Sequence, residues 1–207
     1  GAGKTTIINL ISRFYNLDSG VITIDGIDIT DVKIKSLRKQ MGVMLQDSFM
    51  FSGAIIDNIR YGNMEADDDK VIEAAKTVRA HDFITELEDG YNTEVNERGT
   101  RLSVGQRQLI SFARALLADP KILILDEATS SIDTETEILL QEGLKRLLKD
   151  RTSFIIAHRL STIKNANCIL YVDEGKIVEM GTHDQLLNKK GLYYDLYLSQ
   201  YQFLEKN

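Results

Sequence analysis

The spacing of apolar residues in the first third of the chain predicts helices and strands in alternation. Apolar positions in residues 7–14 recur at the period of one helix face, which predicts a helix that begins just ahead of them. Residues 21–26 alternate like a strand that closes in a turn, and residues 42–46 predict a short buried strand that ends at a glutamine. Three acids open a helix expected over residues 67–78, because acids in a first turn offset the helix dipole.

The C-terminal half repeats this alternation of apolar strands and helices. The expected elements are a strand at 121–125, a helix at 134–148, strands at 152–157, 166–172 and 176–180, a capping box formed by Thr182 and Gln185, and a last amphipathic helix from about 192. Apolar strands that alternate with helices favour an α/β fold with a mostly parallel sheet and flanking helices. Residues 51–118 are mostly helical by pattern, so we expect a helical subdomain inserted within one domain of residues 1–207.

Composition narrows the class of protein. The chain has 207 residues, with 43% hydrophobic and 27% charged residues, which fits one globular domain. A formal net charge of −6 disfavours nucleic acid as the main partner, because phosphate backbones select excess Lys and Arg. The single cysteine, Cys168, excludes an intrachain disulfide and a Cys-rich metal site. No apolar run reaches the roughly 20 residues that cross a bilayer.

Gly3-Lys4-Thr5 is the first segment that carries chemistry. It matches the end of the phosphate-loop pattern G-x-x-x-x-G-K-[ST], whose first three residues would precede Gly1, so we expect the chain to be part of a longer protein. Such a loop opens a helix whose N–H groups face a phosphate; Lys4 then supplies a point charge and the Thr5 hydroxyl a Mg²⁺ ligand. The alternative is a chance Gly-Lys-Thr at a helix start.

A second candidate follows the apolar strand at 121–125, which ends in Asp126-Glu127. In an open α/β sheet, ligands bind beyond the carboxyl ends of the strands. There Asp126 would hold Mg²⁺ and Glu127 would polarise an attacking water as general base. The alternative is that the two acids only cap the following turn.

Ser103-Val104-Gly105-Gln106 supports two interpretations. Ser-x-x-Gln is a capping box, and a long apolar-periodic helix follows it. The same helix N-terminus, with a serine hydroxyl and a glycine N–H, is also an anion site. Both interpretations can hold at once.

These three motifs follow one another along the chain as Gly3-Lys4-Thr5, the Ser103 motif and Asp126-Glu127. In that order they resemble the nucleotide-binding domain of ATP-binding cassette (ABC) transporters, over nearly the whole chain. The resemblance implies a P-loop NTPase-type fold, with ATP and Mg²⁺ as cofactors. It implies that two domains pair head to tail, in a homodimer or a heterodimer, so that the Ser103 motif closes over the ATP of the partner domain. Contacts with the nucleotide would come from Gly1, Gly3, Lys4, Thr5, Thr6, Ser103, Gly105 and Gln106.

Further roles follow from the same resemblance. Gln46 matches the family's Q-loop, as a Mg²⁺ and water contact, and His158 matches the switch histidine at the γ-phosphate. Asp133 resembles the D-loop residue that joins two halves of a dimer; alternatively it is the N-cap of the helix at 134–148. His81 and His183 match no motif, and we assign them no catalytic role.

The sequence departs from the family's usual Leu-Ser-Gly-Gly-Gln at Val104, which does not easily adopt the positive φ open to glycine. Val104 also brings a side chain near the phosphate approach. We expect the motif to work, since Ser103, Gly105 and Gln106 remain, and leave the efficiency of the half-site open. The segment 93–99 resembles one found in ABC exporters, where Glu97 would reach a coupling helix; its alternative is a solvated loop.

The resemblance thus predicts ATP-driven export, with transmembrane domains N-terminal in the same polypeptide and the domain at the cytoplasmic face of the plasma membrane. The alternatives are a stand-alone ATPase subunit of an importer and a DNA-maintenance ATPase. The latter carries a long coiled coil between its phosphate loop and its Leu-Ser-x-Gly-Gln motif, and no sustained heptads appear here.

Overall fold

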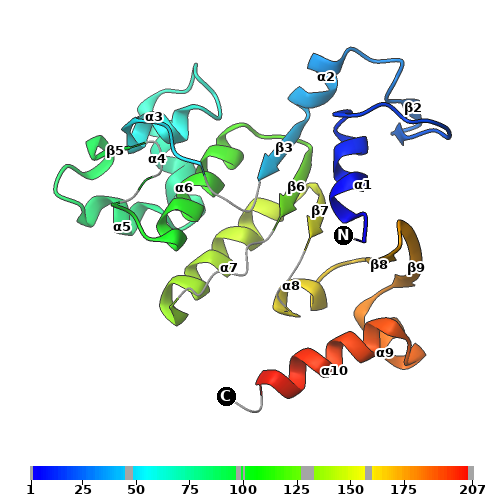
Figure 1. Cartoon of the computed structure of the whole chain (residues 1–207). Coiled ribbons are helices and arrows are strands. Elements are labelled where there is room, and N and C mark those ends of the chain that lie inside the picture. Colours follow the sequence, from blue (N-terminus) through cyan, green and yellow to red (C-terminus); the bar gives the residue numbers. More distant parts are fainter. Residues whose placement is uncertain are drawn as a thin grey trace. The chain divides into compact units, whose positions relative to one another are not determined.

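The computed structural model describes residues 2–44, 49–96, 99, 101–126, 133–156 and 160–204, without the side chains of 160, 161 and 200–204. The chain divides into two compact units, one of Gly1–Ile34 with Ile155–Asn207 and one of Lys35–Phe154. Figure 1 labels the helices and strands of both units. No helix in the described ranges is long and apolar enough to span a bilayer.

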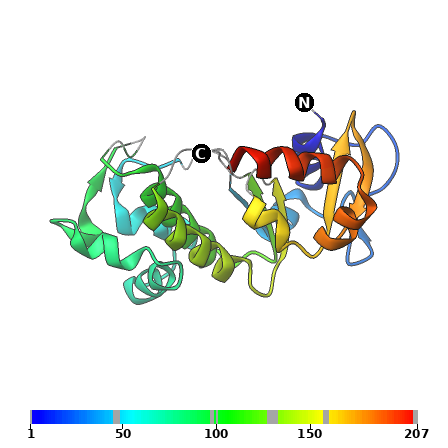
Figure 2. The ribbon, with the colours of Figure 1, turned by 90° about the horizontal axis from the view of Figure 1, so that it is seen from below.

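The first unit contains a phosphate-loop helix, two hairpins and the C-terminal helices. Its elements are α1 (Lys4–Ile11), β1 (Thr23–Ile24), β2 (Ile27–Asp28), α8 (Leu160–Lys164), β8 (Ile169–Asp173), β9 (Lys176–Gly181), α9 (His183–Lys189) and α10 (Leu192–Leu204). β1 pairs with β2 and β8 with β9, each antiparallel. The turn predicted after residues 21–26 is therefore confirmed, and the strands predicted at 166–172 and 176–180 pair as the β8–β9 hairpin. Figure 2 shows this hairpin in orange with α10 in red.

The second unit combines a sheet with most of the helices. Its elements are α2 (Ile34–Lys39), β3 (Met41–Met44), β4 (Gly53–Ala54), α3 (Ile55–Arg60), α4 (Asp68–Thr77), α5 (His81–Glu86), the 3₁₀ turn η1 (Gly90–Asn92), β5 (Glu94–Val95), α6 (Val104–Leu117), β6 (Ile122–Asp126), α7 (Thr134–Leu148) and β7 (Thr152–Ile156). α2 begins and β7 ends at the border with the first unit.

The sheet of the second unit has the order β3-β6-β7 in the described residues. β3 and β6 are parallel, with Met41 opposite Ile122 and Met44 opposite Leu125. Residues 122–125 are all buried, as expected for the middle strand of a parallel sheet. The predicted α/β fold with a parallel sheet and helices is confirmed.

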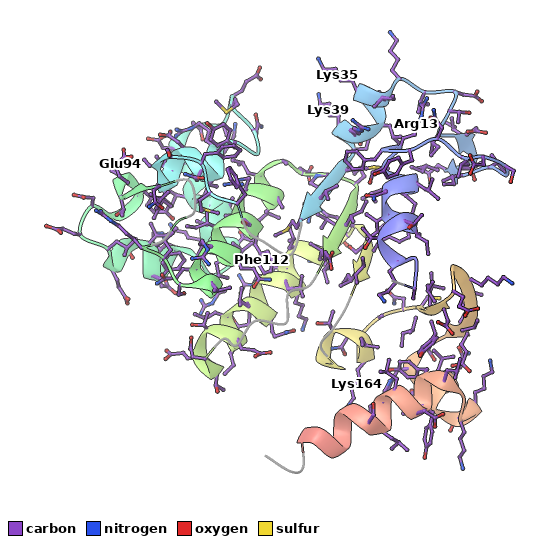
Figure 3. All side chains as sticks on the ribbon, in the orientation of Figure 1. Arg13, Lys35, Lys39, Glu94, Phe112 and Lys164 are labelled. Carbon is purple, nitrogen blue, oxygen red and sulfur yellow. The ribbon has the colours of Figure 1, made fainter. Side chains whose placement is uncertain are left out.

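Helix α6 organises the helical part of this unit. Its apolar side, with Leu109, Ile110 and Phe112, is buried. Phe112, labelled in Figure 3, lies 3.3 Å from the position that a Cβ on Gly143 of α7 would take. All of the predicted 51–118 segment falls within this unit, while its definition as a subdomain stays a prediction.

Two expectations about burial and length are wrong. The strand at 42–46 was expected to be buried, but β3 is only half-buried and Val43 is 40% exposed, because β3 is an edge strand of the described sheet. The first helix was expected to include Phe14, but it ends at Ile11. Arg13 adopts a left-handed φ of 54° there, and its guanidinium donates to the carbonyl oxygens of Ile29 and Val32 at 2.8 and 2.9 Å.

Gly62 marks the closest approach between the end of α3 and α6, and it gives a first testable prediction. A methyl group at Gly62 would overlap the carbonyl oxygen of Arg114 and lie 3.1 Å from the nitrogen of Ala118. Because both atoms belong to a helix backbone, the overlap is not relieved by a rotamer change. We expect Gly62→Ala to lower the free energy of unfolding by about 2–4 kcal/mol, measured by denaturant titration. Gly26→Ala is not a neutral control, since φ is 80° there.

The control for Gly62→Ala is Ser199→Ala, a similarly small change in side-chain size at an exposed site in α10. A loss below about 0.5 kcal/mol for Gly62→Ala would contradict the close approach of α3 and α6.

Candidate nucleotide site

The N-terminus of α1 has the features of an anion site. Its N-cap is Gly3, with φ 96° and ψ 3°, and no side chain caps the helix. The first turn carries no acid, and Lys4, Thr5 and Thr6 are exposed. By contrast, α4, α6, α7 and α9 are capped by Asp67, Ser103, Asp133 and Thr182. The first intrahelical hydrogen bond of α1 runs from the Ile7 N–H to the carbonyl oxygen of Gly3. The N–H groups that precede Ile7 in the first turn are therefore suited to bind a phosphate.

The turn of the β8–β9 hairpin contacts the residues just before α1. The sequence analysis did not predict this contact. The N–H of Gly175 donates to the carbonyl oxygen of Ala2 at 3.0 Å, and a Cβ on Gly3 would lie 3.2 Å from the Cα of Gly175. Gly175 lies about 170 residues away in sequence from Ala2 and Gly3. No local sequence signal could therefore predict that these residues are in contact.

Asp126 is the last residue of β6 and is half-buried. It therefore lies at the carboxyl end of a parallel strand, where ligands of open α/β sheets bind. A carboxylate and a threonine hydroxyl are the hard oxygen ligands that Mg²⁺ prefers. Among the described side chains, no group of three or more His, Cys, Asp or Glu could hold a metal ion.

The Ser103 motif forms the N-terminus of α6. Ser103 Oγ accepts from the N–H of Gln106 at 3.1 Å, and Gln106 Oε1 accepts from the N–H of Ser103 at 2.9 Å, so the predicted capping box is confirmed. A serine hydroxyl that accepts one hydrogen bond still has its proton to donate. Ser103 is exposed, and Gly105 is buried directly behind it. The capping role and an anion-binding role are thus compatible in one geometry.

Val104 does not have the backbone strain that its replacement of the family's usual glycine suggested. It is the first residue of α6 and does not belong to the described residues with positive φ. The argument from positive φ is therefore wrong, because a helical backbone at this position accepts valine, while the efficiency of the half-site stays a prediction. Its side chain is 41% exposed.

Asp133 is the N-cap of α7, as one of its two interpretations predicted. Its carboxylate accepts from the N–H of Thr136 at 2.9 Å. This hydrogen bond from the Thr136 backbone has the largest effect in holding the pKa of Asp133 below its ordinary value, and a hydrogen bond from the Thr136 side chain adds a smaller one. The role of Asp133 in a dimer stays a prediction.

Several expected site residues lie outside the described part of the chain. They are Gly1, Gln46, Glu127 and His158, together with Glu97 of the exporter-like segment. Gly3, Lys4, Thr5 and Thr6 belong to the first unit, and Ser103, Gly105, Gln106, Asp126 and Asp133 to the second. Each group is described within its own unit.

The two histidines without an assigned role each meet a tyrosine. His81 Nδ1 lies 3.0 Å from the hydroxyl of Tyr91, and His183 Nδ1 lies 2.7 Å from that of Tyr193. Burial, and to a smaller extent the negative charge of Asp82, raises the pKa of Tyr91 to about 12. Both contacts tie a helix N-terminus to a following element, which is a structural role.

A parallel sheet, an uncapped glycine-led helix start and an acid at a strand end define the class: a nucleotide-binding domain with a P-loop fold. The sequence pattern of the family described as "ABC transporter" matches residues 1–130. The chain belongs to this family, and its nucleotide-binding domain is the part present.

Similar proteins are ABC transporter proteins of greater length. The chain is 59% identical over 97% of its length to "Uncharacterized ABC transporter ATP-binding protein YknV" of Bacillus subtilis, of which it covers 33%. It is 52% identical over 98% of its length to the "ATP-dependent lipid A-core flippase" of Syntrophus aciditrophicus, of which it covers 34%. The chain thus spans about a third of the curated relatives that it matches.

Among solved structures, the chain is similar to "Structure of a bacterial Atm1-family ABC exporter with ATP bound". The TM-score is 0.88 and the sequence identity 44%, over 96% of this chain and 35% of that one. This likeness confirms the predicted fold.

Two capping boxes in the described part of the chain, at Ser103 and Thr182, allow the capping and nucleotide-binding roles of Ser103 to be separated. Ser103→Ala and Thr182→Ala each remove the same kind of cap, so each should lower the free energy of unfolding by about 1 kcal/mol. If Ser103 also binds nucleotide, only Ser103→Ala should raise the half-saturating ATP concentration of the full-length protein, by about 10-fold. Equal ATP dependence in the two variants would restrict Ser103 to capping.

Proposed function

We propose that this chain is the ATP-hydrolysing domain of a membrane exporter, working as one half of a head-to-tail pair of nucleotide-binding domains. The observation that carries the proposal is the N-terminus of α1, glycine-led, cationic and free of a side-chain cap. Its support is the likeness over 96% of the chain to an exporter solved with ATP bound.

The chain's own residues divide the work at the phosphates. Lys4 and the N–H groups of α1 bind the β- and γ-phosphates, and Gly3 lets the backbone approach them closely. From the motif order, the hydroxyl of Thr5 and the carboxylate of Asp126 are each assigned as Mg²⁺ ligands, and the ion would supply charge neutralisation to the phosphate oxygens. Phosphoryl transfer asks a protein chiefly for such positioning.

Hydrolysis needs an oriented water. Glu127, next to the strand end at Asp126, accepts a proton from the attacking water as general base. Gln46 contacts the same water and Mg²⁺, and His158 contacts the γ-phosphate. These three assignments rest on the motif order of the sequence.

The facing domain completes the site. Ser103, Gly105 and Gln106 at the start of α6 donate to the γ-phosphate of the nucleotide held by the second domain, because a helix N-terminus favours negative charge. The exposed Ser103 hydroxyl and a first turn of α6 without acidic residues suit this contact. ATP then binds the two domains together, and hydrolysis separates them.

An aromatic surface of the second unit suits a membrane partner. Phe49 and Tyr61 are 55% and 47% exposed, and both rings meet Phe51, with centroids 5.0 and 4.2 Å apart. Exposed contiguous aromatic side chains are typical of protein interfaces. We assign this surface to the transmembrane domains, since relatives three times as long include a "Fatty acid ABC transporter ATP-binding/permease protein" of Mycobacterium tuberculosis.

The experiment uses sealed vesicles that contain the full-length protein. Hydrolysis of external ATP by inside-out vesicles, but not by intact right-side-out vesicles, would support a membrane transporter whose ATPase domain faces the cytoplasm. Activity confined to the soluble fraction would contradict the proposed membrane partner, and equal hydrolysis by both vesicle types would contradict the cytoplasmic face.

A further inference from the structure

A buried asparagine in α3 binds the segment that follows Gln46. Asn58 is 1% exposed. Its Oδ1 accepts from the N–H of Phe51 at 2.9 Å, and its Nδ2 donates to the carbonyl oxygens of Phe51 and Ala54 at 2.9 and 3.2 Å. The amide thereby pairs with both backbone groups of Phe51, and this fixes its orientation.

A largely buried arginine of α6 binds the same segment from the other side. Arg114 donates from Nε to the carbonyl oxygen of Asn58 at 2.7 Å, and from a terminal nitrogen to Asn58 Oδ1 at 3.0 Å. Its other terminal nitrogen donates to the carbonyl oxygen of Phe49 at 3.1 Å, and its guanidinium lies 5.3 Å from the centroid of the Phe51 ring. Burial lowers the pKa of Arg114 from its ordinary value, opposed by a smaller effect of Tyr61.

The segment just ahead of Ser103 reaches the same place. Met50 is fully buried, and a Cβ on Gly99 would lie 2.9 Å from Met50 Cγ and 2.8 Å from Arg107 Cδ. Arg107, on the first turn of α6, donates to the carbonyl oxygens of Gly99 and Leu102 at 3.3 and 2.6 Å. Residues 49–51 are therefore held by Asn58, by Arg114 and by the loop that leads into the Ser103 motif.

We propose that Asn58 and Arg114 are positioning residues: through residues 49–51 and the contact of Met50 with Gly99 they set the place of the Ser103 motif. Gly99 precedes Ser103 by four residues. This inference rests on the proposed function, in which Ser103 serves the nucleotide of the facing domain. A displacement of residues 49–51 is thereby transmitted to Ser103.

The network has the properties that such transmission requires. Every contact in it is a hydrogen bond, a packed side chain or a helix backbone, so a shift of residues 49–51 is not absorbed by loose packing. Its hydrogen bonds span 56 residues between Asn58 and Arg114, which ties two helices that are distant in sequence. Loss of the guanidinium would leave the partly buried carbonyl oxygen of Asn58 short of a donor.

Hydrogen exchange in the nucleotide-free, full-length protein tests the network without ATP. In Arg114→Met, peptides covering 49–54 and 99–107 should both exchange at least about 10-fold faster. Arg151→Met is the matched control, because Arg151 is also mostly buried and donates to the carbonyl oxygens of Pro120 and Leu147, away from both peptides. It should leave both peptides unchanged.

The outcomes decide the proposal. Faster exchange only at 49–54 would overturn it, as would acceleration of both peptides in Arg151→Met to the same extent. If Arg114→Met does not accumulate, Arg114→Lys keeps the charge but not the planar fork, and the same comparison applies with a smaller effect. Asn58→Ala combined with Arg114→Met should exchange no faster than the single variants, because the two residues act as one unit.

A second readout separates this proposal from the proposed function. In Arg114→Met, the half-saturating concentration of ATP should rise by about 3- to 30-fold, whereas a lower folded fraction would reduce only the maximal rate. Wild-type ATP dependence in a hydrolysing protein would overturn the positioning role. A wild-type protein that hydrolyses no ATP would contradict the proposed function instead, and hydrogen exchange would still decide the network.

Discussion

Glu127→Gln in the full-length protein is expected to lower the rate of ATP hydrolysis by about 10²- to 10⁴-fold, while ATP binding is retained. The amide keeps the size of the side chain but does not accept the proton of the attacking water. The Lys4 and Ser103 contacts do not depend on this carboxylate, so nucleotide still binds the two domains together. The variant should therefore accumulate as an ATP-bound closed pair, measured by steady-state hydrolysis and by size-exclusion chromatography with retained nucleotide.

Glu135→Gln provides the matched control for Glu127→Gln. Glu135 is an exposed acid in the first turn of α7, eight residues further along, and the same change there should leave hydrolysis within about twofold of wild type. Hydrolysis by Glu127→Gln at the wild-type rate would remove Glu127 from the role of general base.

Lys4→Ala is expected to weaken both binding and hydrolysis. It removes the point charge at the uncapped end of α1, where a charge-assisted hydrogen bond to a phosphate contributes about 1.5–3 kcal/mol to binding. ATP affinity should fall by about 10- to 100-fold, and hydrolysis by more, because charge on the transferring group grows in the transition state. Equilibrium titration with a fluorescent ATP analogue measures the first effect and phosphate release the second.

Lys33→Ala tests whether Lys4→Ala acts through net charge alone. Lys33 is an exposed lysine of the same unit, and its removal changes the net charge equally. It should bind ATP as the wild type does. Equal loss of affinity in the two variants would mean that the long-range field of the domain, and not a contact of Lys4, attracts the nucleotide.

Local sequence signals predicted most of the elements. The helix expected at 134–148 is α7, since Asp133 caps it and its apolar residues keep one period. The Ser-x-x-Gln and Thr-x-x-Gln patterns formed the capping boxes that they predict, because both partners lie within four residues. Where the interacting groups are neighbours in sequence, the pattern was sufficient.

Contacts between distant residues were beyond such reasoning. The half-exposed β3 follows from its place at a sheet edge, and the early end of α1 from a left-handed Arg13. Neither leaves a periodic signal. The pairing of Asn58 with Arg114 spans 56 residues and gives two ordinary polar positions in sequence. At the site, the caps at Ser103 and Asp133 are confirmed, while the roles of Gln46, Glu127 and His158 stay predictions.

The head-to-tail pair is the central claim, and mixed dimers test it most directly. Two differently tagged full-length copies, one with Lys4→Ala and one with Ser103→Arg, are produced together, and dimers that carry both tags are isolated. Retained ATP is then counted after rapid gel filtration. If Ser103 serves the nucleotide of the facing copy, one site of the mixed dimer keeps both residues intact, so about one ATP per mixed dimer should be retained, while dimers of either single variant retain almost none. Retention by mixed dimers no higher than that of the single-variant dimers would contradict the head-to-tail account.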